Sequence, residues 1–87
     1  MPRYFFNVHD GTDLRDLDGT ELGDIYIARS QAIRMSGEIL REMGAKFWNG
    51  TEWRLEVSGE NGNVLFVLRF SAEELPPLPG ASSPILR

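Results

Sequence analysis

A single segment, Ile25 to Met43, has the apolar spacing of an amphipathic α-helix, and strand patterns lie on either side of it. Its apolar residues recur at steps of three and four and form one stripe, which consists of Ile25, Ala28, Ala32, Met35, Ile39 and Met43. Asp24 can cap the free amides at the start of this helix, and Gly44 can end it in a left-handed conformation. Because an apolar stripe must be buried, a chain with one such helix has to pack it against a sheet.

The residues before the helix predict a strand, because Tyr4, Phe6 and Val8 are spaced two apart and so share one face. An Asp-Gly pair ends this strand. The acidic loop, which we define as residues 10–24, follows it and contains a second Asp-Gly turn. Within this loop we expect a short second strand around residues 14–17.

The residues after the helix predict a β-hairpin. Apolar and polar residues alternate over residues 53–58, and an Asn-Gly turn signal precedes the nearly all-apolar run 64–70. A two-residue loop would pair the inner-face residues of the two strands, namely Trp53 with Phe70, Leu55 with Leu68 and Val57 with Phe66. The same register places Arg54 opposite Arg69, an unfavourable pair, so a four-residue loop with the same face parity remains an alternative.

These patterns predict a two-layer α+β sandwich, in which an antiparallel sheet in ββαββ order has the one helix packed on one face. Residues 1–71 would form this single domain, since 87 residues are too few for two. The Pro-rich residues 72–87 are expected to form an extended or disordered tail. Phe5, Leu65 and Val67 would then face outwards, where no second helix is available to cover them.

Charge and composition argue against several classes of function. Nine Lys and Arg against thirteen Asp and Glu give a net charge of −4 without a basic patch, so we expect no nucleic-acid partner. No apolar run reaches the ~20 residues of a membrane span, so we expect no membrane partner. The charged opening segment argues against a secretory signal, and we expect a cytoplasmic location. The lack of cysteine excludes a disulfide framework and a thiol nucleophile.

The acidic loop suggests calcium binding, since calcium prefers several carboxylate oxygens around a glycine turn. When Gly19 is aligned with the glycine of an EF-hand loop, Asp16 and Asp18 fall at ligand positions. Leu14 then takes the first ligand position and Ile25 the last, so too few ligands remain. We therefore expect a solvated acidic loop and no metal site.

His9 is the only histidine, and a general base or metal site around it would need a partner. The adjacent Asp10 would point to the opposite face of the strand, and we expect His9 to lie on the solvent side with Asn7. The sequence also lacks the GxSxG, Walker and GxGxxG motifs. We expect no catalytic residue, no cofactor and no enzymatic activity.

Two further features have both a binding interpretation and a structural one. Tyr4, Phe47, Trp48 and Trp53 could form an aromatic cage or a base-stacking platform. We favour a core role for them, because a small domain needs large aromatic side chains to bury enough surface. The PxxP-like run at residues 76–79 could dock in an aromatic groove, but prolines in a tail more often supply only stiffness.

Several short segments form a joint pattern along the chain. They are M-P-R-Y-F-F-N-V-H-D-G at residues 1–11, D-x-x-E-L-x-D at 18–24, A-R-x-x-A at 28–32, F-W-x-G-x-E-W-R-x-E-V at 47–57 and L-R-F-S at 68–71. Together they resemble a family of small bacterial domains of unknown function, over about residues 1–73. That family has no assigned activity, cofactor or catalytic residue, so the resemblance implies a small domain and no particular chemistry.

The function that we expect is a non-enzymatic, self-associating protein-interaction module, whose partner is a second copy in a homodimer or another protein. One candidate interface is a second helical stripe beside the core stripe, made of Tyr26, Ser30, Ile33, Gly37 and Leu40. The other is the outer sheet face with Phe5, Leu65 and Val67. Within one chain, the acidic loop or residues 47–48 could instead cover the helical stripe. The rival functions are a small-ligand or metal-sensing domain that uses the acidic loop, and an enzyme centred on His9.

Overall fold

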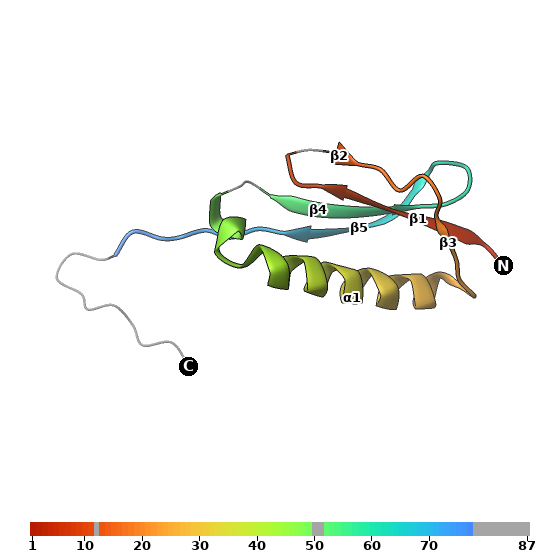
Figure 1. The fold of residues 1–87 in the computed structure, drawn as a ribbon, viewed down its shortest axis with the longest axis horizontal. Helices are drawn as coiled ribbons and strands as arrows, with labels where there is room; N and C mark the ends of the chain where they lie inside the picture. Colours follow the sequence, from red (N-terminus) through yellow and green to blue (C-terminus); the bar gives the residue numbers. More distant parts are fainter. Residues whose placement is uncertain (12, 50–51, 78–87) are drawn as a thin grey trace.

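A computed structural model describes residues 1–11, 13–49 and 52–77 of the chain (Figure 1). The elements are, in chain order, β1 (Arg3–His9), β2 (Asp13–Leu14), β3 (Thr20–Glu21), α1 (Ile25–Met43), the 3-10 helix η1 (Gly44–Asn49), β4 (Trp53–Ser58) and β5 (Val64–Phe70). The sheet forms one layer, and α1 runs along one of its faces as a second layer (Figure 1). The predicted α+β sandwich is therefore confirmed, and its ββαββ order gains the short strand β3 before the helix.

The five described strands form one antiparallel sheet. Four of them follow the order β2-β1-β4-β5, and β3 also pairs with β1. The two-residue strands β2 and β3 pair near opposite ends of β1, with Val8 opposite Leu14 and Tyr4 opposite Thr20. The strand expected around residues 14–17 is thus replaced by two shorter ones. On the other side of the sheet, β5 is the edge strand.

The hairpin has the inner-face pairs that the sequence predicts, with Trp53 opposite Phe70, Leu55 opposite Leu68 and Val57 opposite Phe66. Its turn is longer than two residues: the Gly59 N–H donates to the Asn63 carbonyl at 3.0 Å, and the Gly62 N–H donates to the Gly59 carbonyl at 3.0 Å. Gly62 takes a positive φ of 83°, which glycine adopts without strain. A register shift between Val57 and Ser58 then restores the face alternation that this longer turn would otherwise invert.

The unfavourable pair of Arg54 and Arg69 is present in this register. Each guanidinium has a carboxylate beside it, because Arg54 Nε donates to Glu56 Oε2 at 3.0 Å and Arg69 Nε lies 3.7 Å from Glu52 Oε1. These two carboxylates offset the like charges, so the pair of Arg54 and Arg69 is tolerated in this register.

The core lies between α1 and the central strands β1 and β4. Its buried residues are Tyr4, Phe6, Val8, Ala28, Ala32, Trp53, Leu55 and Val57. The helix contributes small side chains and the sheet contributes large ones, so the two layers can approach closely. Phe66, Leu68 and Phe70 pack against this core but remain partly exposed, because β5 is an edge strand.

Three positions differ from the predicted core. Ser36, which was not expected there, is only 1% exposed, since it continues the row of small residues formed by Ala28 and Ala32. Ile25 was expected in the core stripe but is exposed at the start of α1. Trp48 was also expected in the core and is 59% exposed, because η1 packs Phe47 rather than Trp48 against the core.

Residues 71–77 have no helix or strand, are exposed, and run away from the domain at the end of β5 (Figure 1). The rest of the predicted tail, residues 78–87, lies outside the described residues, and so does the second half of the PxxP-like run. The division into a domain of residues 1–71 and a tail of residues 72–87 therefore stays a prediction.

Candidate functional site

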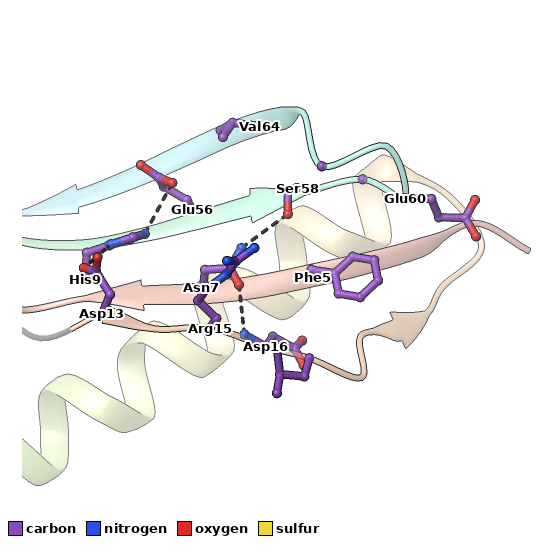
Figure 2. A pocket seen from close by; sticks show the side chains of 13 residues that line it. Phe5, Asn7, His9, Asp13, Arg15, Asp16, Glu56, Ser58, Glu60 and Val64 are labelled. Atoms are coloured by element: carbon purple, nitrogen blue, oxygen red, sulfur yellow. Dashed lines mark hydrogen bonds and ion pairs between the residues drawn. The ribbon is translucent and has the colours of Figure 1, made fainter.

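The outer face of the sheet, away from α1, carries an open groove of about 520 Å³, which we call the polar groove (Figure 2). Strand alternation sends Phe5, Asn7 and His9 of β1 and Glu56 and Ser58 of β4 to this face. Strand β2 and the chain that follows it close one side of the groove with Asp13, Arg15 and Asp16. Polar side chains from three parts of the sequence therefore meet here.

His9 lies between two carboxylates in the polar groove. Its Nδ1 is 2.7 Å from Asp13 Oδ1, and its Nε2 is 3.3 Å from Glu56 Oε1 (Figure 2). The Nδ1 contact is a hydrogen bond, whereas Nε2 is buried near Glu56 without a hydrogen-bond partner among the described residues. Both nitrogens thus face carboxylates of this chain, which makes His9 a link between β2, β1 and β4. His9 lies on the predicted side of β1 with Asn7. Its side chain is only 18% exposed, because Asp13 and Glu56 lie beside it.

Asn7 and Ser58 also contact each other rather than pointing into open solvent. Asn7 Nδ2 donates to Ser58 Oγ at 3.3 Å, and the Asp16 N–H donates to Asn7 Oδ1 at 2.9 Å (Figure 2). The hydroxyl of Ser58 therefore has an amide as its neighbour, not a base that could activate it. The Asn7 side chain thus joins the loop after β2 to Ser58 of β4.

Asp16 fixes the backbone on one side of the polar groove. Its carboxylate accepts the backbone N–H groups of Phe6 at 3.1 Å, Gly19 at 3.0 Å and Asp18 at 3.2 Å. Burial by itself would raise the pKa of Asp16, but these three hydrogen bonds outweigh it and hold the pKa of this carboxyl below its ordinary value. Asp16 thus acts as a negatively charged acceptor that fixes the path of the acidic loop.

Two other carboxylates of the acidic loop contact parts of the fold outside the polar groove. Asp24 Oδ1 accepts the Ile27 N–H at 2.9 Å and caps α1, as the sequence predicts. Glu21 lies 3.3 Å from the guanidinium of Arg3. Among the residues that the structure describes, no group of three His, Asp or Glu side chains could hold a metal ion.

A second groove, of about 610 Å³, runs between α1 and β5, and we call it the apolar groove. It is lined by Ile25, Arg29, Ser30, Ile33, Leu65, Phe66, Val67 and Leu68. Six of these eight side chains are apolar, and Ile33 at its rim is 59% exposed. The groove therefore joins a flank of the helix to an edge strand that has no described neighbour on its outer side.

The apolar groove brings together residues from both of the predicted interfaces, namely Ser30 and Ile33 of the helical stripe and Leu65 and Val67 of the sheet. The other four predicted residues lie elsewhere. Tyr26 is exposed beneath the guanidinium of Arg29, which is 5.5 Å from its ring centre, and Leu40 lines a hollow with Phe47 and Trp48.

Gly37 and Phe5 complete the set of predicted interface residues. A Cβ added at Gly37 would meet nothing within 4 Å, so neither the acidic loop nor η1 covers that part of the stripe. Phe5 is half-buried in the polar groove beside Gly19, and β4 separates it from β5. Phe5 therefore lies outside the apolar groove, although it is on the same outer face of the sheet as Val67.

The sequence patterns do not indicate the partners of His9 or half of the apolar groove. They place Ile25, Phe66 and Leu68 in the core and give no role to Arg29. Their common position follows from the strand order, because only an edge strand leaves the space beside the helix open. The long apolar run 64–70 indicates a strand with apolar residues on both faces, but it does not distinguish an edge strand from a central one.

Residues 3–71 match the family described as Domain of unknown function (DUF6894), so the chain belongs to this family. The resemblance noted over residues 1–73 is thereby confirmed as membership of a family without an assigned function. No curated protein and no solved structure matches the chain.

Proposed function

We propose that this member of a family of unknown function is a non-enzymatic protein-interaction module that associates with a second copy of itself as a homodimer. The observation that supports the proposal is the apolar groove, in which residues of both predicted interfaces meet along α1 and β5. A cytoplasmic location is part of the same proposal, and cell fractionation tests it. No helix in the described part of the chain is long and apolar enough to cross a membrane.

The exposed surface around the apolar groove favours binding of a protein. Ile33 and Leu65 are exposed, and Phe66, Val67 and Leu68 are only half-buried, so water contacts a continuous apolar strip. A contiguous apolar surface often marks an interaction site, whereas single exposed apolar residues do not. Covering it would remove apolar area from water, which is the main driving force of protein association.

The rival function is small-ligand binding in the polar groove, and the size of that groove, about 520 Å³, is the observation in its favour. Its main polar groups are already directed at one another, since His9 faces Asp13 and Glu56, and Asn7 contacts Ser58. A ligand would have to displace these contacts. Calorimetric titration with calcium, and with small amines that a carboxylate-lined groove could accept, tests this function directly.

Light scattering coupled to size-exclusion chromatography tests the proposed self-association. We expect the unmodified chain to have twice the mass of a single chain at high micromolar concentration. The Ile33→Glu variant should be a folded monomer, because a charge in an apolar interface is costly, whereas an exposed helix position tolerates it. Ile27→Glu is the matched control. Ile27 is also an exposed isoleucine of α1, with an exposed fraction of 48% against 59% for Ile33, but it lies outside the apolar groove.

The outcomes separate the possibilities. Folded, monomeric Ile33→Glu together with dimeric Ile27→Glu supports the proposal, with folding checked by circular dichroism. A monomeric unmodified chain overturns it, and so does loss of the dimer in both variants alike.

A further inference from the structure

The two sides of the sheet differ in how their backbone groups are paired. On one side, β2, the Asp16 carboxylate and β3 follow one another along β1 and occupy its backbone groups. On the other side, β5 pairs with β4 alone through six of its seven residues, and no described strand lies beyond it. The outer edge of β5 therefore presents a row of backbone donors and acceptors to solvent.

Proteins usually protect such an edge with proline, lysine, a short strand or an inward-pointing charge. The strand Val64–Phe70, with the sequence V-L-F-V-L-R-F, contains no proline and no lysine. Its one charged residue, Arg69, lies on the outer face beside Glu52, at 3.7 Å. The register shift near Ser58 affects only the start of the strand, so residues 66–70 form a regular edge that is apolar except for Arg69.

We propose that β5 pairs antiparallel with β5 of a second copy, about a two-fold axis that passes midway between the two copies of Val67 or the two copies of Leu68. This inference rests on the proposed function and specifies its interface. Antiparallel pairing about such an axis keeps each residue on its own face of the sheet, so both helices lie on the same side of one continuous sheet. Phe66 and Leu68 of each copy then extend the inner face of the other, next to Ile33, and fill the apolar groove.

The distribution of charge favours a second copy at this edge. The acidic loop, which carries six carboxylates against the single Arg15, lies along β1 at the opposite edge of the sheet. Pairing through β1 would bring two acidic loops together, whereas pairing through β5 keeps them at the far ends of the joined sheet. With a net charge of −4 on each chain, this arrangement minimises the repulsion between copies. Neither register places Arg69 opposite the partner's Arg69.

Single-cysteine crosslinking tests the proposed pairing, and the chain is suited to it because it has no cysteine of its own. The variants are Val67→Cys and Leu68→Cys, with copper phenanthroline as the oxidant. The residue next to the axis lies opposite the same residue of the partner. The two Cα atoms are then about 4.5–5.5 Å apart, which is within disulfide range. Leu65→Cys is the control within the strand, since its two copies would be at least about 13 Å apart. Leu14→Cys is the control on the opposite edge, in β2.

We expect a disulfide-linked dimer at Val67 or Leu68, at least tenfold faster than at Leu65 or Leu14. If light scattering shows a dimer but Val67 and Leu68 crosslink no faster than Leu14, the β5 pairing is wrong and the proposed self-association stands. If the unmodified chain is monomeric at high micromolar concentration, both are wrong.

Discussion

The carboxylate of Asp16 accepts the backbone N–H of Phe6 at 3.1 Å, although Phe6 lies in the middle of strand β1. On this side of β1, strand β2 ends at Leu14 and β3 begins only at Thr20. The side chain of Asp16 therefore bridges the gap between the two short strands. It also accepts the Gly19 N–H, so one carboxylate joins two parts of the acidic loop to the middle of β1.

Replacing Asp16 with alanine should lower the free energy of unfolding by about 1–3 kcal/mol, because three backbone donors lose a charged acceptor. Urea unfolding followed by circular dichroism measures the change. Asp18→Ala is the control, since it removes a carboxylate from the same loop at an exposed position. Equal effects of the two substitutions would show that loop charge matters and the Asp16 hydrogen bonds do not.

The contribution of Asp16 should depend on pH. Its pKa is lowered in the folded protein, so the unfolded chain binds a proton more readily than the folded one. The stabilisation is fully present above the ordinary aspartate pKa of about 3.9 and is lost as the pH falls through the lower folded value. We therefore expect the difference in unfolding free energy between the unmodified chain and Asp16→Ala to shrink from pH 7 to pH 2. A constant difference over that range would contradict the prediction.

Replacing Ser36 with alanine should stabilise the fold. Ser36 is buried in α1, and its Oγ has no hydrogen-bond partner among the described residues. Removing an unpartnered buried hydroxyl should raise the free energy of unfolding by about 1 kcal/mol or more. Ser30→Ala, at an exposed position of the same helix, gives the gain in helix propensity. Because Ser30 lines the apolar groove, both variants are compared at a protein concentration low enough to keep the chain monomeric. If Ser36→Ala is no more stabilising than Ser30→Ala, its hydroxyl has a partner in solution.

Replacing Gly37 with alanine should also stabilise the folded chain, by roughly 0.5–1 kcal/mol, because glycine disfavours a helix interior. Nothing lies within 4 Å of the added Cβ, so the substitution meets no obstacle within the chain. Thermal unfolding measures the gain, and light scattering shows whether the dimer persists. A more stable chain that no longer dimerises would place Gly37 within the interface, as a site of close approach.

The hairpin substitutions Leu55→Ala and Phe66→Ala separate the buried centre of the sheet from its edge. Leu55 is fully buried, and its replacement should cost about 2–5 kcal/mol. Phe66 is only half-buried at the open edge, so its replacement should cost less in the monomer and should weaken the dimer. Urea unfolding at several protein concentrations distinguishes the two effects. Equal costs at every concentration would place Phe66 in the core of a single chain.

The sequence by itself determined the elements whose signals are local. The helix Ile25–Met43 and the inner-face pairs of the hairpin were predicted correctly, because apolar spacing reports which side of an element is buried. The Asp24 cap was also predictable, since a helix cap involves residues only three positions apart.

Only the tertiary structure decided the features that depend on strand order. Spacing shows which face of a strand is buried, but it does not show which strand is its neighbour. The apolar groove exists because β5 is at the edge of the sheet, and His9 meets Glu56 because β4 lies beside β1. Asp16 accepts the Phe6 N–H because the loop after β2 runs back along β1. These contacts join residues that are distant in the sequence, so no local pattern along the chain records them.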